Sequence, residues 1–169
     1  MSIAVEAHAD GLQALDKALI NMAFLGEKPK PIWAAIGQYG ESSTRLRFKK
    51  QAGPDGKAWK PSIRARLSGG QTLVHKARLL RSITHRANNS GAEWGTNVIY
   101  AGVQNDGAVI KPTAAKALRF RMPGGGFVSL KKVTIPARTF MGVNADDGRE
   151  MLALAHDAVD LVARNRGAI

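Results

Sequence analysis

The chain has 169 residues, of which 44% are hydrophobic and 22% are charged, and this composition predicts one folded domain rather than a disordered segment. It contains no cysteine, which excludes disulfide scaffolds, cysteine-ligated zinc sites and thiol catalysis. The formal net charge is +12, no apolar run reaches the roughly 20 residues of a membrane-spanning helix, and we expect no secretory signal.

Two helices are predicted at the N-terminal end. Residues 10–24 carry leucines and a methionine at helical spacing, with Asp10 as a cap, and the segment "GEKPKP" at 26–31 ends this helix. A second helix is expected from near Pro31 to about Gln51. Its apolar side is formed by Ile32, Trp33, Ile36 and Tyr39.

Two glycines interrupt this second helix. Gly37 and Gly40 each weaken it by about 1 kcal/mol relative to alanine. Small residues at this spacing also let another backbone approach closely, which is the alternative interpretation.

A sharp turn follows, in the segment "QAGPDGKAWKP" at 51–61. Pro54 presets the backbone for a turn, and Gly56 tolerates positive φ at no steric cost. Trp59 comes directly after the turn, where we expect it to pin the loop to the core; stacking on a nucleic-acid base is the alternative. Residues 52–75 are predicted as a basic loop.

Positive charge is concentrated around this loop. Between residues 45 and 86 a single acid, Asp55, stands among twelve basic residues: Arg45, Arg47, Lys49, Lys50, Lys57, Lys60, Arg64, Arg66, Lys76, Arg78, Arg81 and Arg86. Such an excess attracts a phosphate backbone or an acidic protein face. A solvated face that only keeps the protein soluble is the alternative.

Residues 76–143 combine short helices with antiparallel strands. A short helix is predicted at 76–83, a hairpin formed by 82–87 and 91–97 around "NNSG", and a helix at 98–107 that ends at Gly107. Two further strands are expected at 116–122 and 127–135. The tip that joins them, Pro123 followed by Gly124, Gly125 and Gly126, has almost no side chains.

The last helix, over 144–166, is the best-defined element. Asn144 can cap it, and Asp146, Asp147 and Glu150 favour the positive end of its dipole. An apolar stripe follows at helical spacing: Met151, Leu154, Ala155, Ala158, Val159 and Val162.

The order of elements predicts an α+β fold. We expect an antiparallel β-sheet with hairpins packed against two N-terminal helices and a long C-terminal helix. The single domain, residues 1–169, then divides into a helical hairpin (1–51), the basic loop (52–75), short helices and strands (76–143) and the C-terminal helix (144–166).

Nothing in the sequence predicts catalysis, a metal or a cofactor. The four histidines, His8, His75, His85 and His156, lack metal-ligand spacing, and His85 alternates within a strand, as a surface or interface residue would. The glycine-rich tip is neither a P-loop nor a dinucleotide-binding fingerprint. We therefore predict that the protein is not an enzyme, and a basic nucleic-acid-binding module is the second interpretation.

Several stretches, in the same order, resemble the Mu-like phage virion morphogenesis (tail completion) proteins. They are "RLRFKKQ" followed by "DGKAWKP" (55–61), then "LVHKARLLRSI" (73–83), "WGTNVIYAGVQNDG" (94–107) and "IPARTFMGV" (135–143). The resemblance covers roughly residues 1–165. The chain departs from it at His75-Lys76-Ala77, where the family usually has Asp-Thr-Gly, after the Tyr-Ala helix, where Gly-Gly is common, and at Thr139, where proline is common.

The resemblance implies a structural role at the head–tail junction of the virion, with assembly in the host cytoplasm. Copies would form a ring, expected to be hexameric, that completes the tail between head-side connector proteins and tail tube proteins. Non-specific contact with DNA in the lumen is compatible with this role; a membrane partner is not expected. We expect an isolated copy to be a monomer or a weak oligomer.

Four groups of residues follow as candidate functional residues. The loop anchor comprises Asp55, Gly56, Trp59 and Pro61, and Trp59 would lock the loop onto the sheet. The basic surface facing a neighbour or DNA comprises Arg45, Arg47, Lys49, Lys50, Lys57, Lys60, Arg64 and Arg66. The hairpin tip comprises Gly124, Gly125 and Gly126, which would reach over a neighbour. The connector to the last helix comprises Pro136, Arg138 as a buried or interface cation, and Phe140 as a core plug.

Overall fold

A computed structural model describes residues 28–167, so the helix expected at 10–24 lies outside the described residues. The helices are α2 (Lys30–Lys50), α3 (Ile63–Ser68), α4 (Arg78–Arg81), α5 (Ala101–Asp106) and α6 (Ala145–Gly167). The strands are β1 (Thr84–Ala87), β2 (Ala92–Gly95), β3 (Ala108–Ile110), β4 (Leu118–Arg121), β5 (Phe127–Leu130) and β6 (Val133–Ile135). The α+β class is confirmed. No helix within residues 28–167 is long and apolar enough to cross a membrane.

The strands form three small antiparallel sheets, where the sequence suggested one. β1 pairs with β2, β4 with β5, and β3 with β6. The strand expected over 127–135 is in fact two strands, because the chain bends at the exposed Lys131 and Lys132 and its two halves pair with different partners. β3 was not predicted, since its three residues are too few for a periodic pattern.

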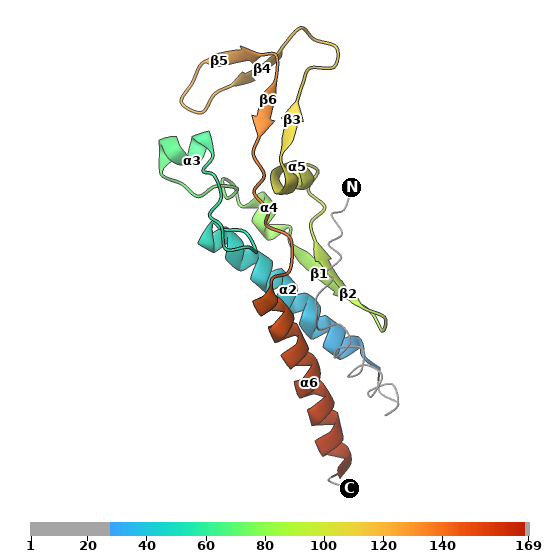
Figure 1. Cartoon of the computed structure of the whole chain (residues 1–169). Coiled ribbons are helices and arrows are strands. Elements are labelled where there is room, and N and C mark those ends of the chain that lie inside the picture. The colour runs from blue at the N-terminus through green and yellow to red at the C-terminus, as the bar shows by residue number, and fades with distance from the viewer. Residues whose placement is uncertain (1–27, 168–169) are drawn as a thin grey trace.

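The two long helices lie side by side and form one end of the elongated molecule (Figure 1). Pro31 lies in the first turn of α2, and Gln51, with φ 56°, ends the helix in the left-handed region. Ile32 and Ile36 of α2 pack with Ala155 of α6, and Trp33, Met151, Ala158 and Val159 surround this contact. The apolar stripe of α6 therefore faces α2.

Reciprocal hydrogen bonds cap the start of α6. The side chain of Asn144 accepts from the backbone N–H of Asp147 at 2.8 Å, and the carboxylate of Asp147 accepts from the N–H of Asn144 at 3.0 Å. This arrangement is a capping box, with aspartate in the place of the usual glutamate.

The glycines of α2 face the β1–β2 hairpin. A Cβ added at Gly40 would lie 2.5 Å from the Trp94 indole, and one added at Gly37 would lie 3.1 Å from the His85 ring. The Trp94 Nε1–H also donates to Thr44 Oγ1 at 3.2 Å. The close approach expected at these glycines exists, but side chains of the hairpin make it instead of another backbone.

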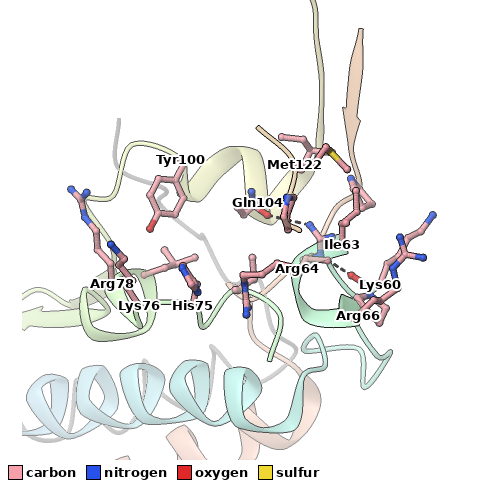
Figure 2. A pocket seen from close by; sticks show the side chains of 18 of the residues that line it. Lys60, Ile63, Arg64, Arg66, His75, Lys76, Arg78, Tyr100, Gln104 and Met122 are labelled. Carbon is pink, nitrogen blue, oxygen red and sulfur yellow. Dashed lines mark hydrogen bonds between the residues drawn. The ribbon is translucent and has the colours of Figure 1, made fainter. Parts of the chain in front are cut away.

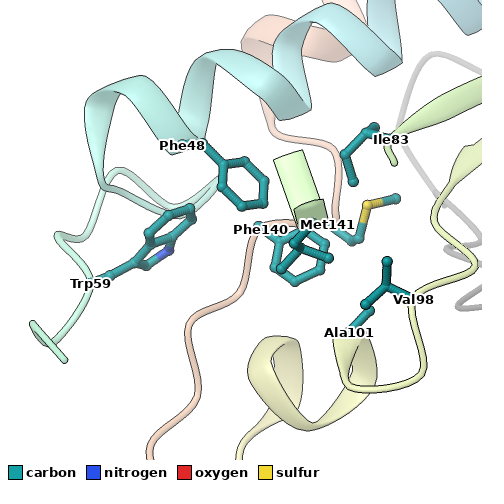
Figure 3. Packing of buried hydrophobic residues seen from close by; sticks show 8 residues of the cluster. Phe48, Trp59, Ile83, Val98, Ala101, Phe140 and Met141 are labelled. Atoms are coloured by element: carbon teal, nitrogen blue, oxygen red, sulfur yellow. The ribbon is translucent and has the colours of Figure 1, made fainter. Parts of the chain in front are cut away.

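A second core lies where the loops meet the end of α2 (Figure 3). Phe48 is its centre: the Trp59 ring lies edge-on to it with centroids 5.3 Å apart, and the Phe140 ring lies at the same distance. The remaining buried members are Leu79, Ile83, Val98, Ala101 and Met141. Trp59 thus packs against α2 and the connector, whereas we expected a sheet.

Arg47 requires a correction. It was expected on the basic surface, but its side chain is buried and its guanidinium lies 2.6 Å from the carboxylate of Asp147. It also donates to the carbonyls of Phe140 and Gly142, at 2.9 and 2.8 Å. Its position on the helix places it on the side that faces α6, where a cation is stable only with such partners.

The segment 52–75 is not wholly a loop, because it contains the six-residue helix α3. Ser62 caps α3 by accepting from the N–H of Ala65 at 3.1 Å. The Gln51 side chain holds the far end of this segment by hydrogen bonds to both backbone groups of Thr72, at 2.6 and 3.1 Å.

An arm, which we define as residues 108–135, projects from the other end of the molecule (Figure 1). The β3–β6 ribbon leaves the body, and the β4–β5 hairpin lies across its end. Both ribbons have two strands, and apolar side chains on them are exposed, among them Val109 (58% exposed) and Phe127 (67%). Isolated two-stranded ribbons are marginally stable in water, so the arm is suited to packing against another surface.

Candidate functional site

A groove of about 730 Å³ lies between α3, the segment before α4, α5 and the arm (Figure 2). We call it the basic groove, because its charged lining residues are all basic. They are Lys60, Arg64, Arg66, Lys76, Arg78 and Arg138, with His75 beside them. Among residues 28–167, no acidic side chain lines the groove.

Two parts of the chain contribute the apolar side chains of the groove. Phe120, Met122 and Ile135 come from the arm, and Leu73 and Leu79 come from α4 and the segment before it. The Tyr100 ring points into the groove from the start of α5 (Figure 2). The groove therefore offers both cationic and apolar contacts.

Arg138 holds the groove together. Its Nε–H donates to the Lys60 carbonyl at 2.8 Å, and its Nη1 donates to Gln104 of α5 at 3.2 Å. The side chain is buried, and burial lowers the pKa of Arg138. By bridging two segments, it fixes the distance between the α3 side and the α5 side of the groove.

The other members of the predicted basic surface divide into two groups. Lys60, Arg64 and Arg66 line the groove, and Arg64 donates to the carbonyl of Gln71. Arg45, Lys49 and Lys50 are exposed on α2, and Lys57 is exposed in the turn, outside the groove. His75, Lys76 and Arg78 line the groove although the sequence analysis assigned them no site; the run of basic residues was the signal for them.

The loop anchor is well ordered by hydrogen bonds. The Asp55 carboxylate accepts from the N–H of Lys57 at 3.1 Å, and this bond lowers the pKa of Asp55. Gly56 has φ 75° and closes the turn by donating to the Gly53 carbonyl at 3.0 Å. The Trp59 Nε1–H donates to the Thr139 carbonyl at 3.0 Å, and Trp59 is only 7% exposed, too little for its ring to stack on a base. Pro61 lines the groove.

The connector and the hairpin tip lie in contrasting surroundings. Phe140 is fully buried, and Pro136 lines the basic groove beside Arg138. Gly124, Gly125 and Gly126 are exposed at the tip of the β4–β5 hairpin, with φ of 95°, 102° and 78°. Only glycine adopts three successive positive φ angles without strain.

The sequence analysis missed Asn105, which positions the connector. Its side chain is buried, and its Oδ1 accepts from the backbone N–H groups of Phe140 and Met141, both at 3.0 Å. The "GVQNDG" stretch gave no sign of this, because the partners are 35 and 36 residues away. The resemblance to a family block at 94–107 was the available hint.

The described residues form no cluster of three or more His, Asp or Glu side chains that could hold a metal ion. In the part of the chain that the structure describes, the groove has donors and positive charge, but no carboxylate that could act as a general acid or base lines it. The groove is therefore suited to bind an acidic or phosphate-bearing partner that also carries apolar groups.

Comparison with known proteins agrees with the motifs. A sequence profile of the phage virion morphogenesis family matches residues 10–160. The chain is 28% identical over 160 residues to the Mu-like prophage FluMu G protein 2 of Haemophilus influenzae, an alignment that covers 95% of this chain and 99% of that protein. No solved structure matches the chain. The family match includes every residue that lines the basic groove.

Proposed function

The chain belongs to the phage virion morphogenesis family and has a structural role in building a phage particle, and we propose that it forms a ring at the head–tail junction that completes the tail. The observation that carries the proposal is the match to the family over residues 10–160. The family expected from the ordered motifs is thereby confirmed.

The shape of the molecule supports an assembly role. Neither hydrophobic cluster of the described residues includes a residue of the arm, which exposes apolar side chains on β3 and β5 and ends in an exposed glycine tip. Such an element gains stability when it packs on another subunit. Six copies in a ring, joined to head-side connector proteins and tail tube proteins, remain the expected arrangement.

The groove supports binding over catalysis. From the described residues it gathers five cations and a buried arginine beside apolar side chains, but no acid. A virion protein with this surface needs no turnover reaction, and we propose that it has none.

Deletion of the gene tests the proposal. Induction of a prophage that lacks the gene should yield filled heads and separate tails, seen by electron microscopy, and complementation with the intact gene should restore joined particles. Normal infectious particles made without the protein would overturn the proposal. The purified protein should behave as a monomer or weak oligomer in light scattering. A stable ring in dilute solution would contradict this expectation about the isolated copy.

The second candidate is a basic nucleic-acid-binding module, which the acid-free lining of the groove favours. Its affinity for unrelated duplexes should then fall steeply with salt, because it rests on neutralised phosphates. Equal affinity at low and high salt, or selectivity for one sequence, would count against contact with DNA in a lumen.

A further inference from the structure

One face of α6 is mainly acidic. Asp146, Glu150, Asp157 and Asp160 are all exposed and are spaced so that an α-helix brings them to one side, opposite the buried Ala155. Arg149 pairs with Asp146 at the start of this side, and the exposed Arg164 lies at its far end. We call the four acidic residues the acidic face. Exposed Leu161 (60%) lies beside it and adds an apolar contact.

Charge is therefore separated along the molecule. From residue 56 to residue 144 the chain has fifteen basic residues and only two acids, Glu93 and Asp106. By contrast, α6 alone has five of the nine acids in the described chain, against three arginines. The partly exposed Glu41 and the exposed Glu93 pair with basic residues of their own neighbourhood. Glu150, Asp157 and Asp160 take part in none of the ion pairs formed among the described residues.

We propose that the acidic face of α6 in one copy docks into the basic groove of the next copy. The two surfaces match in charge, because Glu150, Asp157 and Asp160 would face Lys60, Arg64, Arg66, Lys76 and Arg78, while Asp146 pairs with Arg149 of its own helix. Both surfaces also carry apolar side chains. Leu161 and Ala153 of α6 can contact the apolar side chains of the groove, whereas a phosphate backbone could not. A second copy of this chain thus fits the groove better than DNA.

The two surfaces cannot meet within one copy. α6 runs from its start near the end of α2 away from α3 and from the arm, so the later part of α6, which carries Asp157 and Asp160, lies toward the opposite end of the molecule (Figure 1). Different patches meeting between identical chains make a heterologous contact, which closes into a ring when the rotation per copy allows it. This inference rests on the proposed function, since it concerns how neighbouring copies join in the particle.

Exposed ion pairs are individually weak and screened by salt. A contact built largely from them holds poorly between two free copies. It becomes effective where neighbouring proteins already hold several copies side by side.

Engineered cysteines test the proposal cleanly, because the chain has none of its own. Lys76→Cys and Asp157→Cys are combined in one full-length chain, particles are purified, and a short bifunctional maleimide is added. The double variant should give a ladder of covalent multimers. Each single variant, and a control that combines Asp157→Cys with Arg86→Cys on β1, should give monomer only. Monomer alone from the double variant, or multimers from a single variant, would overturn the proposal.

Charge exchange provides a second readout. Lys60→Glu, Arg64→Glu and Lys76→Glu together should lower particle yield at least 10-fold in a host that lacks the gene, and Glu150→Lys, Asp157→Lys and Asp160→Lys together should do the same. Circular dichroism checks that each variant is folded. Both sets in one chain should restore most of the yield. A defect confined to the groove set, with no restoration, would overturn the proposal and indicate DNA in the groove.

The proposed function and the docking of α6 in the groove would fail in different experiments. If the protein is absent from purified particles, the proposed function fails. If the protein is present in particles but the double variant does not crosslink, only the docking of α6 in the groove fails.

Discussion

The guanidinium of Arg47 lies 2.6 Å from the carboxylate of Asp147, and both side chains are buried, so one ion pair joins α2 to α6 across 100 residues of chain. Tyr39 and Ser43 also donate to the same carboxylate. Arg47 in turn reaches two carbonyls of the connector. This cluster fixes the direction in which α6, and with it the acidic face, leaves the body.

Replacing Arg47 by alanine should lower the free energy of unfolding by about 3–5 kcal/mol, because Asp147 would remain buried without a cation. Urea unfolding followed by circular dichroism measures this loss. Arg86→Ala is the matched control: it removes an exposed pair with Glu93, and should cost less than about 1 kcal/mol. Equal losses in the two variants would contradict a structural role for the buried pair.

Tyr39 should make stability depend on alkaline pH. Burial, together with the charge of Asp147, raises the pKa of Tyr39 to about 12 from the ordinary 10.0. The fold thus favours the protonated phenol, and its contribution is full below pH 10 and is lost as pH rises through about 12. The stability difference between the wild type and Tyr39→Phe should be constant up to about pH 10 and then shrink. A difference that stays constant to pH 12 would refute the pKa assignment.

Gly40→Ala should destabilise the protein by about 1–3 kcal/mol, because the new Cβ would lie 2.5 Å from the Trp94 indole and must displace it. Gly102→Ala in α5 is the control, since nothing beyond its chain neighbours and the backbone of its own helix lies within 4 Å of the added Cβ. That substitution should be neutral or stabilising by up to about 1 kcal/mol. Thermal unfolding compares the two. If Gly40→Ala proves as harmless as its control, the hairpin is not packed on α2 as described.

Ala77→Gly should stabilise the chain by about 0.5–1 kcal/mol. Ala77 precedes α4 with φ 54°, in the left-handed region where glycine is favoured, and it stands where the resemblance led us to expect glycine. The reverse exchange is Gly69→Ala, at φ 67° with open space around it, which should destabilise by a similar amount. Differential scanning calorimetry measures both, and a destabilised Ala77→Gly variant would contradict the reasoning.

Local patterns of the sequence predict the long elements well and the tertiary pairings poorly. The limits of α2 and the Asn144 cap of α6 follow from prolines, periodicity and capping chemistry, which act over a few residues. The Arg47–Asp147 ion pair could not be predicted in this way, because helical periodicity does not show which distant segment of the chain packs against Arg47. The basic groove combines side chains from residue 60 to residue 138, so its positive charge was predictable and its shape was not.

The short strands show the same limit. Apolar and polar residues alternate along 127–135 as they do in a single strand. The division into β5 and β6 depends on the different strands with which the two halves pair. Trp59, by contrast, was expected as a loop anchor from its turn alone, and the structure places it in the core around Phe48.

Cryo-electron microscopy of the neck of purified particles tests the central claim most directly. We expect a ring of density between the head connector and the tail tube. Residues 28–167 of each copy should fit this density, with α6 of one copy in the groove of the next. A complete neck that contains no copy of this chain, or copies found only elsewhere in the particle, would contradict it.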